Sequence, residues 1–118
     1  MDSFDAVVEC QPMMVEMGKA YIEQLILEQF VAGVDAADET IQQPLILMEQ
    51  LYALSMIEEY KGWYLENGYI EGRKAVYISK MVDELCLKTR AHCSDLVDAF
   101  GIPDGLIKAP IATEYPYT

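Results

Sequence analysis

The chain has 118 residues and a mass of 13.3 kDa, so its length allows a single domain over residues 1–118 and hardly two. Its hydrophobic content of 53% excludes intrinsic disorder, and 20 acidic against 8 basic residues give a formal charge of −12 at pH 7. Because a surface this negative repels phosphate groups, we expect neither nucleic acid nor an anionic membrane surface as a partner.

Apolar residues that recur at three- and four-residue steps predict a first helix from Pro12 to Ala37. Its core-facing stripe would consist of Val15, Ile22, Ile26, Phe30 and Val34. Pro12 fits the first helical turn, where its missing N–H has no hydrogen bond to lose. The acidic segment 35–39 then predicts a short loop.

The second predicted helix runs from Thr40 to Glu66. Thr40 is a good N-cap, and Gln43 stands three residues later, as in a capping box. The apolar stripe of this helix consists of Leu47, Leu51, Leu54 and Ile57. The Asn-Gly pair at 67–68 predicts a left-handed C-cap. Gly62 costs about 1 kcal/mol relative to Ala inside a helix, which indicates the close approach of another backbone.

A near-heptad pattern predicts a third helix from Gly72 to Phe100. Its stripe consists of Ala75, Ile78, Val82, Leu85, Thr89, His92, Leu96 and Ala99. Gly101 is the expected C-cap, and Pro103 ends the helix. The predicted fold class is therefore all-α: an up-down bundle of three long helices, plus a short turn within residues 103–108 and an extended tail.

Targeting signals and cysteine usage both bear on the location of the chain. The longest uncharged stretch, Thr40–Met48, has nine residues, far fewer than the roughly 20 that a membrane-spanning helix needs. The acidic N-terminus does not match a signal peptide, and residues 115–118 carry no peroxisomal tripeptide. Cys10, Cys86 and Cys93 show no CxxC spacing, and we expect Cys86 and Cys93 to behave as small buried hydrophobes. These features predict a cytoplasmic location.

Catalytic and metal-binding patterns are scarce in this sequence. His92, the single histidine, lies on the stripe of the third helix, where a buried or half-buried structural histidine is favoured over a ligand. Only Cys86 and Cys93 are near it, so no zinc site is predicted. Adjacent helical positions point about 100° apart, which makes His92 and Cys93 a poor nucleophile–base pair. Glu84 and Lys88 have the spacing of a helical ion pair.

A family resemblance is carried by several segments. They are residues 51–59 (Leu-Tyr-Ala-Leu-Ser-Met-Ile-Glu-Glu), residues 62–69 (Gly-Trp-Tyr-Leu-Glu-Asn-Gly-Tyr), Leu85-Cys86 and Arg90-Ala91-His92. The pattern is most specific in residues 96–104 (Leu-Val-Asp-Ala-Phe-Gly-Ile-Pro-Asp), and residues 31–35 and 109–112 extend it towards both ends. In these residues the chain resembles the C-terminal helical domain of acyl-CoA oxidases, in order and over nearly its whole length.

The resemblance implies the chemistry of FAD-dependent enzymes that oxidise the Cα–Cβ bond of an acyl-CoA to a trans-2-enoyl-CoA and are reoxidised by O₂. The family's catalytic base is a glutamate in a preceding helical domain, within a Tyr-Glu-Gly type motif. Glu71-Gly72 lies downstream of that position, and Arg73 departs from the motif, so no catalytic residue is expected here. The sequence also lacks a phosphate-binding loop, and we expect the isolated chain to bind no FAD and to be inactive.

Three functional hypotheses follow from this resemblance. In the favoured one, the chain is an accessory C-terminal domain or small subunit of a split acyl-CoA oxidase or dehydrogenase, and it assembles with a separate flavin-binding polypeptide that carries FAD. In the second, it is a non-catalytic helical interaction module derived from the same fold. In the third, it binds an acyl chain in an interior rich in Met and aromatic residues.

The surplus of large apolar side chains predicts an oligomer and not a monomer. The expected interface residues are Trp63, Tyr64, Tyr52 and Met56, because aromatic residues and Met are enriched at interface centres. Together with Tyr60 and Tyr69, Trp63 and Tyr64 form an aromatic cluster that favours a helix–helix seam over a ligand-binding box. An alternative in which Trp63 caps the internal core stays open.

Overall fold

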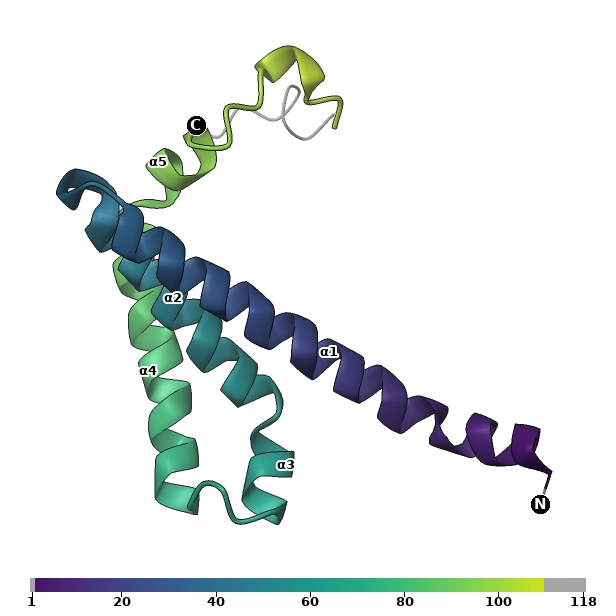
Figure 1. The fold of residues 1–118 in the computed structure, drawn as a ribbon. Helices are drawn as coiled ribbons and strands as arrows, with labels where there is room; N and C mark the ends of the chain where they lie inside the picture. The colour runs from purple at the N-terminus through teal and green to yellow at the C-terminus, as the bar shows by residue number, and fades with distance from the viewer. Residues whose placement is uncertain (1, 110–118) are drawn as a thin grey trace.

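The computed structural model describes residues 2–109, and all regular structure in this range is helical (Figure 1). The three long helices are α1 (Ser3–Ala36), α2 (Glu39–Glu59) and α4 (Gly72–Arg90). The short elements are α3 (Lys61–Glu66), α5 (Cys93–Asp98) and a 3₁₀ turn, η1 (Asp104–Leu106). The chain reverses direction between α1 and α2 and again between α3 and α4 (Figure 1). The predicted all-α class is confirmed, as is the short turn within residues 103–108.

Helix α2 lies at the centre of the fold and packs against both α1 and α4. The long N-terminal part of α1 projects away from the other helices, so the described residues do not confirm a closed bundle (Figure 1). The radius of gyration is 19.4 Å, whereas a compact domain of this length has about 13.5 Å. The accessible surface is 9786 Å², compared with roughly 6,500 Å² for a compact monomer of the same mass. The chain by itself therefore leaves much of its surface without a packing partner.

The core is small and lies where α2 meets α1 and α4. The buried residues are Val34 of α1, Leu47 of α2, and Ala75, Leu85 and Thr89 of α4. The near-heptad stripe predicted for the third helix is confirmed for its central part, because Ile78 and Val82 are half-buried between these positions. Ala99, at the far end of the predicted stripe, is exposed. The near-heptad spacing of apolar residues therefore predicted the packed face of α4 correctly.

Helix α1 differs from the prediction in its start and in its inward face. It begins at Ser3, so Pro12 lies inside the helix, where it removes one backbone hydrogen bond without ending the helix. Of the predicted core stripe, Val34 is buried and Phe30 half-buried, but Val15, Ile22 and Ile26 are exposed. The physical reason is the side of the helix on which these residues lie. The residues of α1 that face α2 are Glu23, Leu27, Phe30 and Val34, and at about 100° per residue the three exposed residues point to another side.

Helix α2 begins one residue before Thr40, which corrects the predicted N-cap. The N-cap position belongs to Asp38, no side chain caps the helix, and the predicted capping box is absent from this end. The side-chain amide of Gln42 instead donates a hydrogen bond to the Val34 carbonyl at 3.2 Å. This bond ties the start of α2 to the end of α1 and satisfies a carbonyl of α1, but it caps no N–H of α2.

The predicted second helix is divided at Tyr60, which leaves the helical conformation and separates α2 from α3. The division occurs two residues before Gly62, a residue with low helix preference. Apart from its chain neighbours and the backbone of its own helix, no atom of the described residues lies within 4 Å of the position that a Cβ on Gly62 would occupy. The close backbone approach predicted at Gly62 is therefore wrong for the described residues. The left-handed C-cap is confirmed, since Gly68 has φ +71°.

The predicted third helix is also divided, because α4 ends at Arg90 and α5 begins at Cys93. The His92 N–H donates to the Thr89 carbonyl at 2.9 Å, an i to i+3 bond that tightens the last turn of α4. Gly101 has φ +60°, which confirms it as a left-handed cap. Cys86 and Cys93 are exposed, contrary to expectation, because Cys86 lies off the buried line of α4 and Cys93 begins the separate helix α5. The predicted extended tail after residue 109 lies outside the described residues.

Among residues 2–109, no helix combines the length and the apolar composition needed to cross a bilayer.

Candidate functional site

The most distinctive side-chain arrangement is an aromatic cluster formed by Trp63, Tyr64 and Tyr69. The rings of Trp63 and Tyr69 stack with centroids 5.4 Å apart and an interplanar angle of 16°. Tyr64 packs edge-on against both, at 5.4 Å from Trp63 and 6.2 Å from Tyr69. Such pairs stabilise one another beyond the area that they bury, so the three rings form a rigid apolar surface.

The turn after α3 fixes the geometry of this cluster. Asn67 donates its side-chain amide to the Trp63 carbonyl at 2.9 Å, and the Tyr69 N–H donates to the Tyr64 carbonyl at 2.9 Å. The positive φ of Gly68 lets the chain turn back so that Tyr69 reaches Trp63. Lys61 donates to the Ser79 hydroxyl at 2.8 Å and so attaches α3 to α4. The cluster is therefore held by backbone and polar contacts that do not depend on a ligand.

The predicted interface residues occupy two different environments. Trp63 is 54% exposed and Tyr69 is 68% exposed, so two rings of the cluster face solvent. Tyr64, Tyr52 and Met56 are half-buried. The Tyr52 hydroxyl donates to the Glu23 carbonyl of α1 at 3.5 Å, which places Tyr52 at the α1–α2 seam. The assignment of all four residues to an intermolecular interface stays a prediction.

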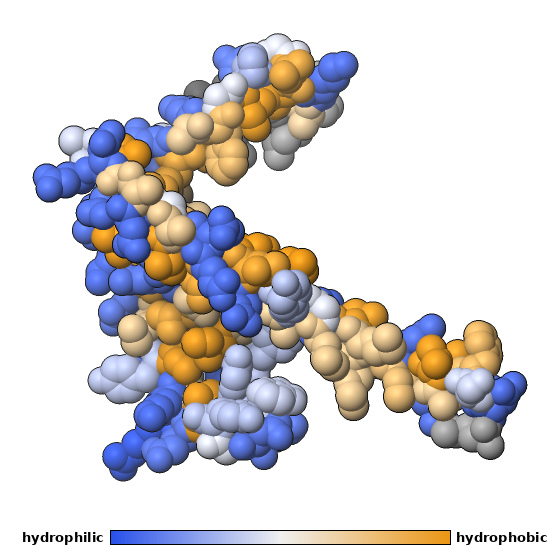
Figure 2. Space-filling model, viewed as in Figure 1, coloured by the Kyte–Doolittle hydropathy of each residue, from blue (hydrophilic) through white to orange (hydrophobic). Residues whose placement is uncertain are grey.

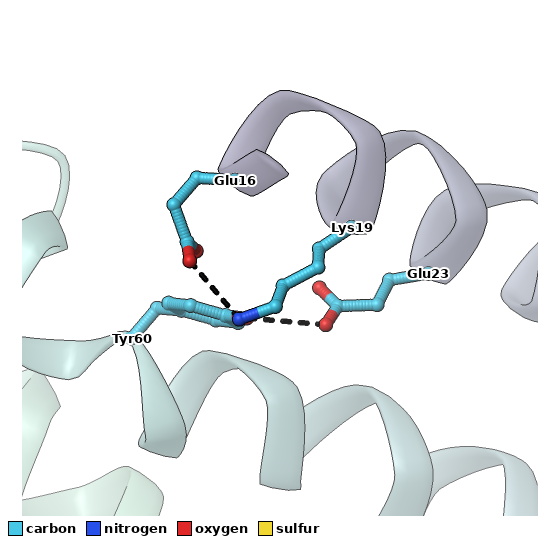
Figure 3. Close-up of polar contacts among 4 residues, drawn as sticks. All are labelled: Glu16, Lys19, Glu23 and Tyr60. Carbon is cyan, nitrogen blue, oxygen red and sulfur yellow. Dashed lines mark hydrogen bonds and ion pairs between the residues drawn. The ribbon is translucent and has the colours of Figure 1, made fainter. Parts of the chain in front are cut away.

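Tyr60 does not join the aromatic cluster but belongs to a polar group that connects α1 and α2 (Figure 3). Its hydroxyl donates to Glu23 Oε1 at 3.2 Å, and on α1 the Lys19 ammonium pairs with Glu16 at 3.0 Å. Burial raises the pKa of the Tyr60 hydroxyl above its ordinary value of 10.0, and the Glu23 carboxylate raises it further. The hydrogen bond from Lys19 to Glu16, and the charge of Glu16, raise the pKa of Lys19 above 10.5. Both shifts favour the protonated forms, a neutral Tyr60 and a charged Lys19.

The predicted ion pair between Glu84 and Lys88 does not form. Within the described residues, ion pairs join Lys19 to Glu16 and Lys61 to Glu58. Glu84 and Lys88 instead line a shallow groove of about 360 Å³ between α2 and α4. The other lining residues are Glu49, Gln50, Ala53, Leu54, Met81 and Leu85.

This groove does not fit FAD. The pyrophosphate of FAD requires converging donors or positive charge. The groove offers the carboxylates Glu49 and Glu84 against the single cation Lys88. No reaction step is therefore assigned to a flavin in this groove.

The residues considered for catalysis are dispersed. Glu71 is exposed at the N-cap of α4, and His92 is half-buried at the N-cap of α5. The Cys93 thiol contacts the Thr89 carbonyl at 3.6 Å. Within residues 2–109, no three His, Cys, Asp or Glu side chains converge into a metal-binding group.

A second exposed apolar surface lies on α1, and the sequence analysis did not identify it. Phe4, Met14, Tyr21 and other large apolar residues of this helix are exposed. The signal was present in the sequence as a second set of apolar positions at three- and four-residue spacing. Because α1 is apolar on two sides, the period alone could not tell which side packs inward.

These observations define an all-helical domain with a small core and extensive exposed apolar surface. A family model described as acyl-CoA oxidase matches residues 1–114. The chain belongs to the acyl-CoA oxidase family, and its match is to the C-terminal helical domain, as the sequence motifs predicted.

Curated relatives agree with this assignment. Acyl-coenzyme A oxidase 2, peroxisomal, of Arabidopsis thaliana is 32% identical over 115 residues, which cover 97% of this chain and 17% of that protein. Acyl-coenzyme A oxidase 1 of Yarrowia lipolytica is 31% identical over 108 residues, covering 92% of this chain and 16% of the relative. The acyl-coenzyme A oxidase-like protein of Mus musculus is 28% identical over 110 residues, with coverage of 92% and 17%.

The chain thus spans about one-sixth of the length of these relatives. No solved structure matches it significantly.

Proposed function

We propose that this chain is the accessory C-terminal domain, or a small subunit, of an FAD-dependent acyl-CoA oxidase or dehydrogenase that oxidises the Cα–Cβ bond of an acyl thioester. A separate flavin-binding polypeptide supplies FAD and the catalytic base, and this chain contributes assembly. The observation that carries the proposal is the excess of exposed surface. The chain exposes 9786 Å², where a compact monomer of its mass exposes roughly 6,500 Å².

The aromatic cluster supports one part of the proposed interface. Trp63 and Tyr69 expose a preordered apolar surface next to the half-buried Tyr64. Rigid aromatic side chains lose little conformational entropy on binding and are common at interface centres. In the proposed assembly, Trp63 and Tyr64 face the flavin-binding partner, with Tyr52 and Met56 behind them.

The same assembly accounts for the open arrangement of the helices. Helix α2 contacts both α1 and α4, but α1 and α4 each retain exposed apolar residues, such as Met17 and Leu87. An apolar helix of a partner packed against these faces would complete the up-down bundle predicted from the sequence.

A cytoplasmic location is part of the proposal. It rests on the sequence features that predict it, whereas the name of the Arabidopsis thaliana relative places that enzyme in the peroxisome. Imaging of a fluorescent fusion of the chain together with its partner distinguishes the two locations.

Co-expression tests the function. The chain is produced with the flavin-binding part of an acyl-CoA oxidase truncated before its C-terminal helical domain. We expect a yellow complex that purifies as one species and releases hydrogen peroxide when short-, medium- or long-chain acyl-CoA is added. The chain alone serves as the first control and is expected to be colourless and inactive.

The truncated flavin-binding polypeptide alone serves as the second control, and the complex must exceed its activity. A flavin-binding polypeptide that is fully active by itself, and that does not retain this chain on purification, contradicts the proposal. That outcome favours the non-catalytic interaction module.

A further inference from the structure

The groove between α2 and α4 combines an apolar floor with charged borders. The floor consists of the buried Leu85 and the half-buried Ala53 and Leu54. The charged residues at its borders are Glu49 of α2, and Glu84 and Lys88 of α4. Figure 2 shows hydrophobic residues along the projecting part of α1 and a mixture of hydrophobic and hydrophilic residues over α2 and α4. The groove therefore offers a partner both apolar contact and charge.

The dimensions of the groove fit a helix better than a small molecule. Pockets for small molecules usually enclose roughly 70–90% of the ligand surface, whereas this groove of about 360 Å³ is shallow. From Met81 to Lys88 it follows α4 for seven residue steps, which is about 10 Å or two helical turns. A groove between two packed helices accepts a third helix that inserts side chains spaced by three or four residues. The groove therefore has room for two turns of an amphipathic helix.

Two carboxylates determine the charge that this helix should carry. Glu49 is half-buried on the α2 side, and Glu84 is exposed on the α4 side. The two ion pairs found among residues 2–109 involve neither of them. Removing a carboxylate from water is costly unless a cation or hydrogen-bond donor replaces the water. An apolar helix that covered the groove would bury both groups further, so it must supply positive charge.

Lys88 does not neutralise the groove. Two carboxylates and one ammonium leave it with a formal charge of −1, within a chain of formal charge −12. Lys88 lies in the last turn of α4, where a cation is favourable next to the unpaired helix carbonyls. The fold of this chain therefore accounts for Lys88, whereas Glu49 and Glu84 have no partner among the described residues.

We propose that the groove between α2 and α4 binds an amphipathic helix of the flavin-binding polypeptide. Two apolar side chains of that helix, one turn apart, contact the floor, and an Arg or Lys side chain pairs with Glu49 and Glu84. This inference rests on the proposed function and specifies the chemistry of the partner segment. It uses a surface separate from the aromatic cluster, which lies on α3 and the turn after it. The negative charge of the whole chain favours the approach of a basic segment.

Charge reversal in the full chain tests the sign of the partner segment. Binding to a flavin-binding acyl-CoA oxidase polypeptide that lacks its C-terminal domain is measured by titration calorimetry. We expect Glu84→Lys to weaken the affinity at least tenfold, because it places a cation against the partner's cation. The matched control is Asp83→Lys, which makes the same charge change on the same helix but outside the groove. The control should weaken binding less than threefold.

Both substitutions keep the fold intact. Glu84 and Asp83 are exposed, so circular dichroism should show unchanged helix content in the two variants.

Photochemical cross-linking identifies the segment that enters the groove. Benzoylphenylalanine replaces Met81, which lines the groove and is 44% exposed, and in a control chain it replaces Leu87, which lies outside the groove and is 70% exposed. We expect position 81 alone to cross-link to a helical segment of the partner that contains Arg or Lys, identified by mass spectrometry. Changing that basic residue to Glu should restore the affinity for Glu84→Lys to within about threefold of the wild-type pair.

The possible failures are distinguishable. If the wild-type chain binds but both charge reversals weaken binding equally, or position 81 does not cross-link to a basic helical segment, the inference about the groove is wrong and the proposed function stands. Failure of the partner's reversed charge to restore binding has the same meaning. If the wild-type chain does not bind the flavin-binding polypeptide at all, the proposed function and this inference are both wrong.

Discussion

Thr89 is buried in α4, and its hydroxyl oxygen Oγ1 has no hydrogen-bond partner within the described residues. A buried polar atom without a partner costs about 1–3 kcal/mol. The sequence analysis placed Thr89 correctly on the packed stripe, but periodicity reports only position. Whether a hydroxyl finds an acceptor depends on the neighbours that tertiary packing brings to it.

Replacing this hydroxyl should stabilise the protein. Thr89→Val keeps the shape of the side chain and removes the unpaired polar atom, so we expect the free energy of unfolding to rise by about 1 kcal/mol. Urea denaturation followed by circular dichroism, at one fixed protein concentration, measures the change. Thr89→Ser, which keeps the hydroxyl and loses the methyl group, should lower stability. A less stable Thr89→Val variant would show that the hydroxyl has a partner.

The polar group of Tyr60, Lys19, Glu16 and Glu23 predicts a loss of stability in alkaline solution. The folded chain raises the pKa of Tyr60 above 10.0 and that of Lys19 above 10.5. A group whose pKa is raised by folding contributes stability that is present below its ordinary pKa and is lost as the pH rises through the raised value. The free energy of unfolding should therefore fall above about pH 10, when a Tyr60 phenolate would face the Glu23 carboxylate.

Denaturation at about pH 9 and about pH 11 measures this loss. Tyr60→Phe removes the titrating hydroxyl and should show a smaller decrease between the two conditions than the wild-type chain. An equal decrease in both proteins would mean that Tyr60 does not link α1 to α2.

At the scale of elements, the sequence predicted the helices better than their limits and contacts. The stripe of α4 was predicted correctly in its central part because a near-heptad period reflects one packed face directly. The divisions at Tyr60 and His92 were missed because neither position carries proline or glycine. The inward face of α1 was assigned incorrectly at Val15, Ile22 and Ile26, since a helix with two apolar sides contains no local signal of which one packs internally.

The two glycines around the aromatic cluster should respond in opposite ways to alanine. Gly62 is inside α3 with open space around it, so Gly62→Ala should raise the free energy of unfolding by about 0.5–1 kcal/mol. Gly68 has φ +71°, and Gly68→Ala should lower it by about 1 kcal/mol. Denaturation of both variants under identical conditions measures the two changes in the free energy of unfolding. Stabilisation by Gly68→Ala would contradict the left-handed turn that holds Tyr69 against Trp63.

Trp63 provides the test of the aromatic interface. Trp63→Ala should weaken binding to the flavin-binding polypeptide by at least about 30-fold, the effect of losing an anchor worth about 2 kcal/mol. The helix content of the isolated chain should change little, because Trp63 is 54% exposed. Titration calorimetry and circular dichroism measure the two quantities. Collapse of the helix content with unchanged affinity would place Trp63 in the core, the alternative left open by the sequence.

The whole molecule is an incomplete packing unit. The radius of gyration is 19.4 Å, five of residues 2–109 are buried, and the N-terminal part of α1 projects from the other helices. We expect a domain with these properties to gain stability in an assembly. The family could be recognised from sequence because its motifs lie in segments 51–69 and 96–104. The unpartnered surfaces could not be located from sequence, because exposure is a property of the arrangement of helices and not of any one of them.

Calorimetric titration of this chain into a flavin-binding acyl-CoA oxidase polypeptide that lacks its own C-terminal domain tests the central claim most directly. Burial of a standard interface predicts saturable binding with a negative heat-capacity change of about −0.2 kcal/mol/K, obtained from titrations at several temperatures. The absence of binding, or binding with no heat-capacity change, would contradict the claim that the exposed apolar surface of this domain is completed by that partner.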